Sequence, residues 1–481
     1  MDDRSDRQVL IASNRGPVSF TPSDGGAPAL RRGGGGLVSG LAGVAGRAEV
    51  LWVCAALSDT DRQAAREAPG GRLDLAGHDT GGAVRMLDIP AATFRRAYNG
   101  VANSTLWFVH HLLYDTPNAP HFDARSRRDW QSYEAYNAAF ADALARDAAP
   151  GARVAIQDYH LSLAPLMLRE RRPDLRIAHF SHTPWAPPEY YRLLPDDLGV
   201  RVLEGILGAD HAGFLADRWA EAFLDCCEAV LDAKIDRHAR TVTHAGRTTR
   251  IGVHALGVDG AALRARAAEP DVAARAAALR AQVDGRRLIV RIDRTELSKN
   301  LVRGLAAYRE LLANHREWHG RVVHLAFAYP SRYDLPEYRA YTEEVRRAAA
   351  SIIEEFGTDT WQPLILQVED DYPRSLAAYG LADVLLVNPI RDGMNLVAKE
   401  GPVLSERDCA LVLSREAGAA AELAEDALTV NPYDVSQTAE ALHRALLMPA
   451  GERAERCRRL VEAATALPPD RWFADQLAAL D

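Results

Sequence analysis

VLLVNPIRDGMNLVAKE, residues 384–400, passes from an apolar run through a polar loop into a helical pattern. The run Val384–Val387 predicts a buried strand, because a short apolar run bounded by Asn-Pro is typical of one. Asp392 and Gly393 form the predicted turn, and a helix is expected to begin at Met394. A strand that leads through a turn into a helix is half of a βαβ unit, so this stretch favours an α/β fold with a parallel sheet.

The same alternation of short apolar runs and Ala-, Arg- and Glu-rich stretches continues outward along the chain. Further strands are expected at 9–13, 50–56, 154–157, 177–181, 211–215, 288–292, 322–328, 364–368, 410–413 and 427–430. The length of 481 residues exceeds what one hydrophobic core usually supports. We therefore expect two Rossmann-like α/β domains that face each other across a cleft.

The domain boundary is expected at 245–262, where four glycines precede a long Ala- and Arg-rich helix at about 261–283. We assign residues 1–250 to the N-terminal domain and 251–460 to the second domain. Residues 461–481 are expected to form a C-terminal helix that packs back on the first domain.

Composition excludes several classes of protein. The net charge of −9 argues against a general nucleic-acid or membrane-surface binder. No apolar run approaches the roughly 18 residues of a membrane span, and the acidic N-terminus does not resemble a signal peptide. The five cysteines are scattered and form no CxxC pair, which indicates a reducing cytoplasm without disulfides or a zinc site.

Polar side chains follow several predicted strands directly, and ligands of open α/β sheets bind at the carboxyl ends of strands. Asp158 and His182 follow two strands of the N-terminal half. Arg294 and Lys299, one of only three lysines, follow the first strand of the second half, and Arg332 follows the next. Two cations at one strand end suit a diphosphate, whose charge needs fixed positive partners. The alternative for each is a solvated turn or a structural core residue.

Weaker signals lie nearer the N-terminus. Arg15 falls at the end of the first strand, where a bidentate contact to an anion is geometrically accessible. The glycines 33–36 precede an apolar helix start and could let backbone N–H groups approach an anion. They match neither a P-loop nor GxGxxG. Tyr98 and Trp107 are polar-tipped aromatics that could equally be core residues.

The segments SNRGP (13–17), QDYHL (157–161), SHTPW (181–185), SKN (298–300), PSR (330–332) and RDGMNLVAKE (391–400) closely resemble, in order and spacing, those of trehalose-6-phosphate synthases. These are retaining glycosyltransferases of family 20 with the two-domain GT-B fold. The similarity extends from about residue 8 to 475. It implies an N-terminal acceptor domain, a C-terminal nucleotide-sugar domain, and transfer of glucose from a nucleoside diphosphate glucose to glucose 6-phosphate.

The resemblance also implies roles for individual residues. Arg15, Tyr98, Trp107 and Arg332 would grip the phosphate of the acceptor. The residues that match the family's donor site are Gly35, Gly36, Arg294, Lys299, Asp392, Gly393, Met394, Asn395, Leu396, Val397 and Glu400.

Within the donor site, Arg294 and Lys299 would bind the diphosphate together with the N–H groups of Leu396 and Val397, and Glu400 would hold the ribose. The sugar hydroxyls would be contacted by Asp158, His182 and Asp392, and these three with Arg294 and Lys299 make up the expected catalytic set. Lys399, beside Glu400, is expected to form a supporting ion pair.

No metal or other cofactor is expected, because Arg294 and Lys299 would take the place of the metal that other glycosyltransferases hold with Asp-x-Asp. Asp59-Thr-Asp61 matches that pattern but is interpreted as a solvated turn. The expected partners are the two substrates, with no nucleic acid and no membrane. Neither a monomer nor a homo-oligomer is excluded.

For the donor base we favour GDP-glucose over UDP-glucose. The segment after the strand at 364–368 carries Glu369, Asp370 and Asp371. A carboxylate can accept both the N1–H and the amino group of guanine, whereas uracil offers one N–H between two carbonyls. The alternative is that all three acids face solvent.

The sequence departs from the family at Ala55-Ala56-Leu57-Ser58, where a Gly-Trp-Ser-Gly is familiar, so one acceptor-side aromatic is missing. Residues 404–423 also resemble pseudo-glycosyltransferases, which join cyclitols through a C–N bond. Those relatives degrade the RDGMNLV motif, which this chain retains. A non-catalytic sugar-phosphate sensor is a further alternative, disfavoured by Arg294 and Lys299. An NAD-dependent dehydrogenase would need a GxGxxG motif, which is absent.

Overall fold

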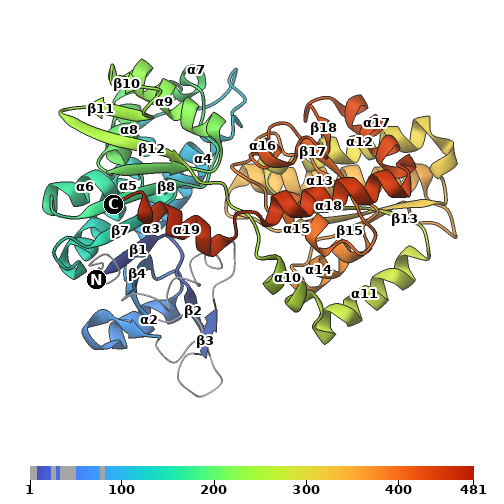
Figure 1. Ribbon diagram of the computed structural model, residues 1–481, viewed down its shortest axis with the longest axis horizontal. Coiled ribbons are helices and arrows are strands. Elements are labelled where there is room, and N and C mark those ends of the chain that lie inside the picture. The colour runs from blue at the N-terminus through green and yellow to red at the C-terminus, as the bar shows by residue number, and fades with distance from the viewer. Residues whose placement is uncertain (1–7, 23–28, 33–49, 76–81) are drawn as a thin grey trace. The chain divides into compact units, whose positions relative to one another are not determined.

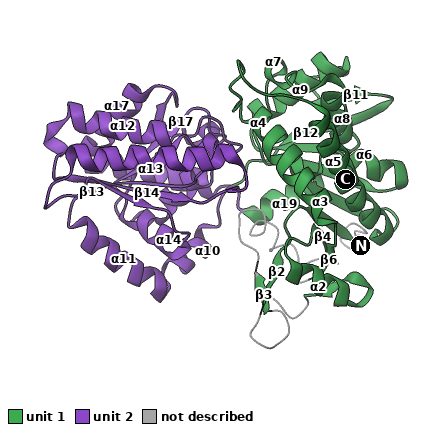
Figure 2. Ribbon diagram, turned by 180° about the vertical axis from the view of Figure 1, so that it is seen from behind, with its two compact units in different colours: residues 1–256, 469–481 green, residues 257–468 purple. Residues whose placement is uncertain are grey.

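A computed structural model describes residues 8–22, 29–32, 50–75 and 82–481 of the protein (Figure 1). The chain divides into two compact units, coloured separately in Figure 2. Unit 1 contains residues 1–256 with 469–481, and unit 2 contains residues 257–468. These limits differ by six to eight residues from the expected 250 and 460, because the last strand of the unit 1 sheet ends at Val253 and a helix of unit 2 continues to Thr465.

Unit 1 is built on a ten-stranded sheet with the order β10-β11-β12-β9-β8-β7-β1-β4-β6-β5. Its parallel strands are β1 (Val9–Ser13), β4 (Val50–Ala55), β6 (Ala83–Leu87), β7 (Arg153–Gln157), β8 (Arg176–Ser181), β9 (His211–Phe214) and β12 (Arg247–Val253). The antiparallel edges are β5 (Leu73–Asp74), β10 (Lys234–Asp236) and β11 (Thr241–His244), and β2 (Val18–Thr21) pairs separately with β3 (Ala29–Arg32). In chain order the seven parallel strands read 3-2-1-4-5-6-7 across the sheet. The strand order therefore reverses between β1 and β7, which is the place where doubly wound sheets bind ligands.

Helices flank this sheet and bury its central strands, of which β1 and β4 are buried along their whole length. The helices of unit 1 are α2 (Asp59–Glu67), α3 (Ala91–Arg95), α4 (Trp107–His110), α5 (Ala124–Asp147), α6 (Ala164–Arg171), α7 (Pro188–Tyr191), α8 (Asp196–Leu207), α9 (Asp217–Leu231) and α19 (Pro469–Ala478). The C-terminal helix α19 belongs to unit 1, where the indole N–H of Trp472 donates to the carbonyl of His254 over 3.1 Å.

The expected solvated turn at Asp59-Thr-Asp61 is wrong. These residues form the first turn of α2, and the Asp61 carboxylate is buried. It accepts from the backbone N–H of Phe20 over 2.7 Å and of Ser58 over 3.0 Å, while Ser58 caps the helix in return. Asp61 therefore stabilises a helix start, since a capping box satisfies N–H groups that the helix itself leaves without partners.

Unit 2 is built on a six-stranded sheet that is parallel throughout, with the order β15-β14-β13-β16-β17-β18. The strands are β13 (Arg287–Arg294), β14 (Val322–Tyr329), β15 (Leu364–Gln367), β16 (Val384–Val387), β17 (Ala410–Ser414) and β18 (Leu428–Val430). Their chain order, 3-2-1-4-5-6, is that of a dinucleotide-binding Rossmann sheet. The order reverses between β13 and β16, so the carboxyl ends of these two strands are the expected position of a ligand.

Two layers of helices cover the unit 2 sheet (Figure 1). One layer holds α12 (Leu301–Asn314), α13 (Pro336–Phe356) and α17 (Val435–Leu447), and the other holds α10 (Gly260–Ala267), α11 (Pro270–Val283), α14 (Tyr372–Leu381), α15 (Val397–Leu404) and α18 (Ala450–Thr465). The single helix expected at 261–283 is in fact two, because Pro270 can begin a helix but cannot continue one.

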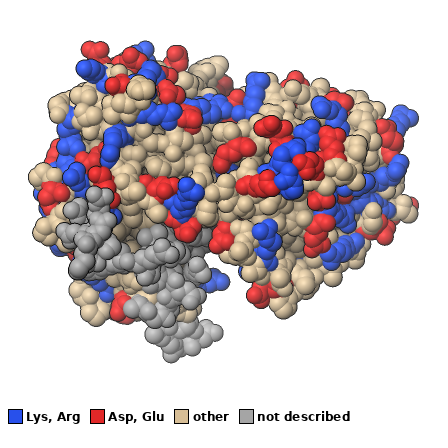
Figure 3. Space-filling model, viewed as in Figure 1, with Lys and Arg blue, Asp and Glu red and all other residues tan. Residues whose placement is uncertain are grey.

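Two properties of the surface and of the helices bear on function. Figure 3 shows basic and acidic side chains of the described residues interspersed over one face, in keeping with the modest net charge. Within the described ranges, no helix combines the length and the apolar character that crossing a membrane requires.

Candidate active site

The carboxyl ends of β13 and β16 bring together two residues that are 93 positions apart in the chain. Lys299 closes a short 3-10 turn, Leu297–Lys299, that follows β13, and Asp392 lies in the loop that follows β16. The ammonium of Lys299 donates to Oδ2 of Asp392 over 2.5 Å. Burial alone would lower the pKa of Lys299, but Asp392, with Asp293 and Glu296, outweighs burial and raises it. The lysine is therefore a fixed positive charge at the switch point of the sheet.

The turn that carries Lys299 is held in place by Arg291, a residue of β13 whose side chain is buried. The Arg291 guanidinium donates to the carbonyl of Lys299 over 2.9 Å and to Asp293 over 2.8 Å. Because the support is a buried ion pair with directed hydrogen bonds, the lysine backbone has little freedom to move.

The loop between β16 and α15 is pinned at several points. The side chain of Asn395 donates to Oδ2 of Asp392 over 3.0 Å and accepts the N–H of Ala398 over 3.1 Å. Gly418 donates its N–H to the carbonyl of Asp392 over 3.0 Å, and a Cβ added to Gly418 would meet the carbonyl oxygen of Gly393 at 1.9 Å. The backbone of this loop is therefore fixed by contacts that only glycine permits at position 418.

The helix after this loop begins at Val397, three residues later than the expected Met394. Asn395 has a φ of 83°, a left-handed conformation that asparagine tolerates, and its side chain caps the helix. Leu396 and Val397, the residues expected to offer N–H groups to a diphosphate, are thus the N-cap and the first residue of α15.

Glu400 lies one turn into α15 and faces α14. The hydroxyl of Tyr379 donates to Oε2 of Glu400 over 3.2 Å. Burial raises the pKa of Glu400 to about 7, an effect that this hydrogen bond only partly offsets. Its neighbour Lys399 is buried and pairs with the partly exposed Glu422 over 2.5 Å, so the expected ion pair of Lys399 is present.

A second cluster joins the turns after β13 and β14, which are neighbouring strands. Its centre is Glu296, whose side chain is 0% exposed. Oε1 lies 3.1 Å from Nη2 of Arg294 and accepts the hydroxyl of Ser331 over 2.8 Å, and Oε2 lies 3.3 Å from Nη1 of Arg332. Burial would raise the pKa of Glu296, but Arg294 and Arg332 outweigh it and hold the pKa at about 2. Arg332 also donates to the hydroxyl of Tyr338 over 2.8 Å.

In unit 1 the corresponding edge carries Asp158, directly after β7, and His182, directly after β8. Asp158 has a φ of 75°, and its Oδ1 accepts the backbone N–H of His182 over 3.2 Å. Burial would raise the pKa of Asp158, but His160 and His182 outweigh it and bring the pKa to about 2. Burial lowers the pKa of His182, and its Nε2 lies 2.9 Å from Oε1 of Gln157. The pair is thus a carboxylate beside a neutral imidazole near pH 7.

The other expected residues of unit 1 lie near this edge. Arg15 follows β1, the strand beside β7, and is exposed. Tyr98 lies in a π-helix, Arg96–Leu106, and stacks on His160 with ring centroids 5.5 Å apart. Trp107 follows this segment and stacks on His111 at 3.8 Å. π-helical turns are rare and often mark functional sites. Gly35 and Gly36 lie outside the described residues.

The three acids expected to read the base differ in position. Glu369 and Asp370 are exposed. Asp371 instead caps α14 by accepting the N–H of Arg374 over 3.0 Å, and it pairs with Arg275 over 2.7 Å. Both oxygens of Asp371 thus have partners within the protein, whereas contact of any of the three acids with a base stays a prediction.

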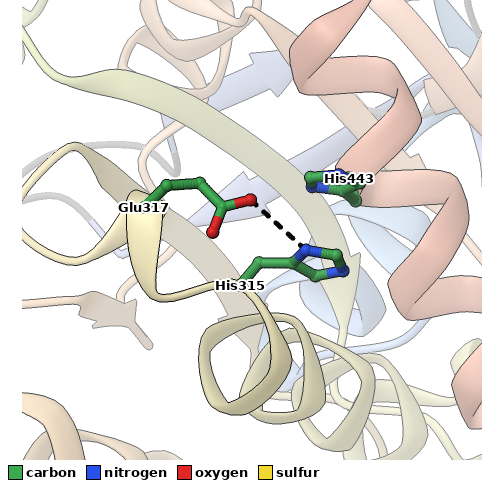
Figure 4. A group of neighbouring side chains, drawn as sticks. All are labelled: His315, Glu317 and His443. Atoms are coloured by element: carbon green, nitrogen blue, oxygen red, sulfur yellow. Dashed lines mark ion pairs between the residues drawn. The ribbon is translucent and has the colours of Figure 1, made fainter.

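Among the described residues, one group has the composition of a metal site: His315, Glu317 and His443 (Figure 4). Figure 4 shows the Glu317 carboxylate facing the His315 ring, 3.4 Å from its Nδ1, with His443 beside them. The indole N–H of Trp318 donates to Nδ1 of His443 over 3.0 Å. That bond uses the lone pair of His443 and leaves the proton on Nε2, so His443 is not poised to bind a metal. His315 also follows the end of α12, at the sheet edge opposite Lys299.

Charged groups thus lie at the switch point of the unit 2 sheet, the place where Rossmann sheets usually bind phosphorylated ligands. The model of the family described as glycosyltransferase family 20 matches residues 7–481. The chain therefore belongs to glycosyltransferase family 20 and is a glycosyltransferase. The predicted fold class, an α/β protein of the GT-B type with two Rossmann-like units, is confirmed.

Individual proteins agree with this assignment. The chain is 33% identical over 485 residues to a bifunctional trehalose-6-phosphate synthase/phosphatase of Thermoproteus tenax, covering 98% of this chain and 63% of that protein. It is 32% identical over 479 residues to a validamine 7-phosphate valienyltransferase of Streptomyces hygroscopicus, covering 98% and 94%. The crystal structure of an α,α-trehalose-phosphate synthase (UDP-forming) from Burkholderia vietnamiensis has a TM-score of 0.84 and 28% identity, covering 98% of this chain and 99% of the other.

Three residues that the sequence analysis did not single out belong to the candidate site: Glu296, Tyr379 and Gly418. Their partners lie 21 to 36 positions away along the chain (Arg332, Glu400 and Gly393), so no local pattern signals them. A charged residue between the two cations of the RTELSK segment was the one available sign for Glu296.

Proposed function

We propose that the protein transfers glucose from a nucleoside diphosphate glucose to glucose 6-phosphate with retention of configuration, forming α,α-trehalose 6-phosphate. The observation that carries this proposal is the fixed Lys299–Asp392 pair at the switch point of unit 2. A lysine there can stabilise a leaving diphosphate, while the aspartate orients both the lysine and a sugar hydroxyl. The names of the Thermoproteus and Burkholderia relatives support the same reaction.

In this proposal the donor is held by unit 2. Lys299 and Arg294 contact the diphosphate, together with the N–H groups of Leu396 and Val397 at the start of α15. Glu400 accepts hydrogen bonds from the ribose hydroxyls. The glucose hydroxyls contact Asp392, and in unit 1 they contact Asp158 and His182.

The acceptor phosphate is a dianion and needs cations. Arg332 supplies one from unit 2, and Arg15 supplies one from unit 1, where Tyr98 and Trp107 offer polar aromatic tips. Because the phosphate carries most of the charge of the acceptor, we expect free glucose to be a poor substrate.

Chemically, the proposed reaction needs no protein nucleophile. The acceptor hydroxyl attacks on the face from which the diphosphate leaves, and the departing phosphate oxygen takes the hydroxyl proton. The C1–O bond to the diphosphate breaks while the C1–O bond to the acceptor forms, through an oxocarbenium-like centre. The protein contributes position and charge, because Lys299 and Arg294 stabilise the negative charge that develops on the leaving group.

The test is direct. The purified protein is incubated with glucose 6-phosphate and either UDP-glucose or GDP-glucose, and the product is examined by proton NMR. Two α-anomeric signals from a 1,1-linked disaccharide phosphate are expected. Hydrolysis of the donor without transfer, or a β-linked product, would contradict the proposal.

The donor base is the finer part of the proposal. The expectation of GDP-glucose now rests on Glu369 and Asp370, since Asp371 caps α14. The name of the Burkholderia relative, UDP-forming, favours UDP-glucose instead. If a carboxylate binds guanine, kcat/KM is higher for GDP-glucose than for UDP-glucose. Asp370→Ala should then lower the ratio of kcat/KM for GDP-glucose to kcat/KM for UDP-glucose. A higher kcat/KM for UDP-glucose in the wild type, or a ratio unchanged in Asp370→Ala, means that the acids do not read guanine.

A second candidate is coupling of a cyclitol to an amine through a C–N bond, which the likeness to the valienyltransferase favours. The discriminating measurement pairs validamine 7-phosphate with a nucleoside diphosphate cyclitol and compares the rate with that of glucose 6-phosphate and a nucleoside diphosphate glucose. Turnover of the glucose pair at least tenfold faster is expected, because the chain retains the RDGMNLV motif at 391–397, and the reverse order would select the second candidate.

Donor binding is expected to depend on pH through Glu400. The ribose hydroxyls donate to the carboxylate, so the ionised form binds better, and the pKa of Glu400 is about 7. Below that pH, affinity for UDP or GDP should fall by about tenfold per unit, because the proton must first leave. Calorimetric titration between pH 5.5 and 8.5, about 1.5 units on either side, measures this.

Tyr379→Phe removes the hydrogen bond that favours the ionised carboxylate, so the same binding profile should move to higher pH. Tyr308→Phe is the matched control, because this buried tyrosine of the same unit donates to the carbonyl of Pro363 instead. A profile that is flat across neutral pH, or one that moves equally in both variants, would count against the role of Glu400.

A further inference from the structure

We propose that Glu296 is a positioning residue. Its single carboxylate holds in place both Arg294, which is assigned to the donor, and Arg332, which is assigned to the acceptor. The inference rests on the proposed function, which assigns Arg294 to the donor diphosphate and Arg332 to the acceptor phosphate. It goes beyond that proposal, because Glu296 itself contacts neither substrate in it. Its effect on each substrate passes through an arginine.

The two oxygens of the Glu296 carboxylate contact different arginines. Oε1 lies 3.1 Å from Arg294, and Oε2 lies 3.3 Å from Arg332. The hydroxyl of Ser331 donates to Oε1 over 2.8 Å and fixes the orientation of the carboxylate plane. Each oxygen therefore serves one arginine, and a rotation that improved one contact would weaken the other.

Burial makes the arrangement rigid. The Glu296 side chain is 0% exposed and that of Arg332 is 9% exposed, whereas the Arg294 side chain is 55% exposed. The backbone of the turn is also tied, since the N–H of Thr295 donates to the carbonyl of Tyr329 at the end of β14 over 2.6 Å. The carboxylate thus lies between the ends of β13 and β14, which this hydrogen bond joins. The guanidinium of Arg294 is largely exposed, and its contact with Glu296 holds it on one side.

Charge explains why such a residue is needed. Without ligands, two guanidinium groups on adjacent strand ends repel each other, and each long side chain samples many rotamers. A buried carboxylate between them offsets the repulsion and selects one rotamer of each. Guanidinium has five N–H donors in a planar group, so it can pair with a carboxylate and bind a phosphate at the same time. The two phosphate-binding groups are therefore ordered before either substrate arrives, which reduces the entropy lost on binding.

Glu296→Gln keeps the size of the side chain and removes its charge. We expect it to raise the KM of the donor and the KM of glucose 6-phosphate together, each by about tenfold, the scale for removing the partner of a buried polar group. Arg332→Ala should raise mainly the KM of the acceptor. Glu296→Asp, which restores the charge on a shorter stem, should recover most of both values.

The direction of the change separates positioning from a simple effect of charge. Loss of a negative charge by itself strengthens the attraction of the site for anions, so a field effect alone would lower both KM values. Lower or unchanged KM values in Glu296→Gln would overturn the inference. So would a rise confined to one substrate.

Asp383→Asn is the matched control. Asp383 is also a buried carboxylate of unit 2 shared by two arginines, Arg287 at 2.8 Å and Arg407 at 3.1 Å, but it precedes β16 and so lies at the opposite edge of the sheet. It should lower the melting temperature and leave both KM values unchanged. A rise of both KM values in Asp383→Asn as well would assign the effect to general destabilisation and overturn the inference.

Two further measurements keep the test decisive. If Glu296→Gln does not fold, Ser331→Ala replaces it and should raise both KM values in the same direction by a smaller factor; unchanged values would overturn the inference. If the wild type forms no trehalose 6-phosphate, the proposed function fails. Calorimetric binding of UDP, GDP and glucose 6-phosphate to wild type and Glu296→Gln then decides the inference separately, because weaker binding of both classes supports it and unchanged binding overturns it.

Discussion

Replacement of Lys299 by alanine is expected to lower kcat by about 10²–10³-fold, the range for loss of one fixed donor to a developing negative charge. The ammonium is held 2.5 Å from Asp392 at the carboxyl end of β13, where the leaving diphosphate is proposed to lie. The charge on that leaving group grows as the C1–O bond breaks. The contact is therefore stronger in the transition state than in the bound donor, and KM for the donor should change much less than kcat.

Steady-state kinetics with both substrates varied measures this change. Lys234→Ala is the control, because Lys234 is an exposed lysine on β10 of unit 1. A donor KM that rises while kcat stays constant would show that Lys299 contributes only to ground-state binding, and would contradict the proposed role.

The second large effect is expected for Arg332→Ala, which should weaken the binding of glucose 6-phosphate by roughly 2–5 kcal/mol, the scale for truncating one partner of a buried charge pair. The Arg332 side chain is only 9% exposed, so water would compete little with the proposed contact to the acceptor phosphate. Its loss also leaves Glu296 with one arginine instead of two. The KM of glucose 6-phosphate measures the change, with free glucose as a second acceptor.

Arg346→Ala serves as the control for Arg332, because Arg346 lies on α13 of the same unit and pairs with Glu343 on an exposed helix face. Its KM values should match those of the wild type. Comparable turnover of free glucose and glucose 6-phosphate by the wild type would show that no phosphate clamp operates.

Several elements could be predicted from the sequence because one residue pattern determines them. The limits of β1 and β16 match the predicted runs 9–13 and 384–387, since continuous apolar residues between polar ones specify a strand buried on both faces. Asp158, His182, Lys299 and Asp392 follow predicted strands, and parallel strands necessarily end at one edge.

Other elements could not be predicted because local patterns do not determine them. The strands β11 and β12 were missed, since Thr241–His244 and Arg247–Val253 are rich in Thr and Arg and are stabilised by pairing at the sheet edge. The three-residue delay in the start of α15 depends on the Asn395 side chain, which caps the helix from a left-handed backbone. Whether Asp371 reads a base or caps a helix depends on Arg374 and Arg275, and Arg275 is 96 positions away.

The near contact between Gly418 and the carbonyl of Gly393 has a consequence for protein engineering. The loop between β16 and α15, proposed to bind the donor sugar, is shaped by a second segment of backbone, and even one methyl group at position 418 would displace the loop. Libraries that aim to change the donor are therefore best restricted to exposed positions such as 369 and 370, with 418 kept as glycine. Variants substituted at position 418 would have a displaced loop and are not expected to form the site.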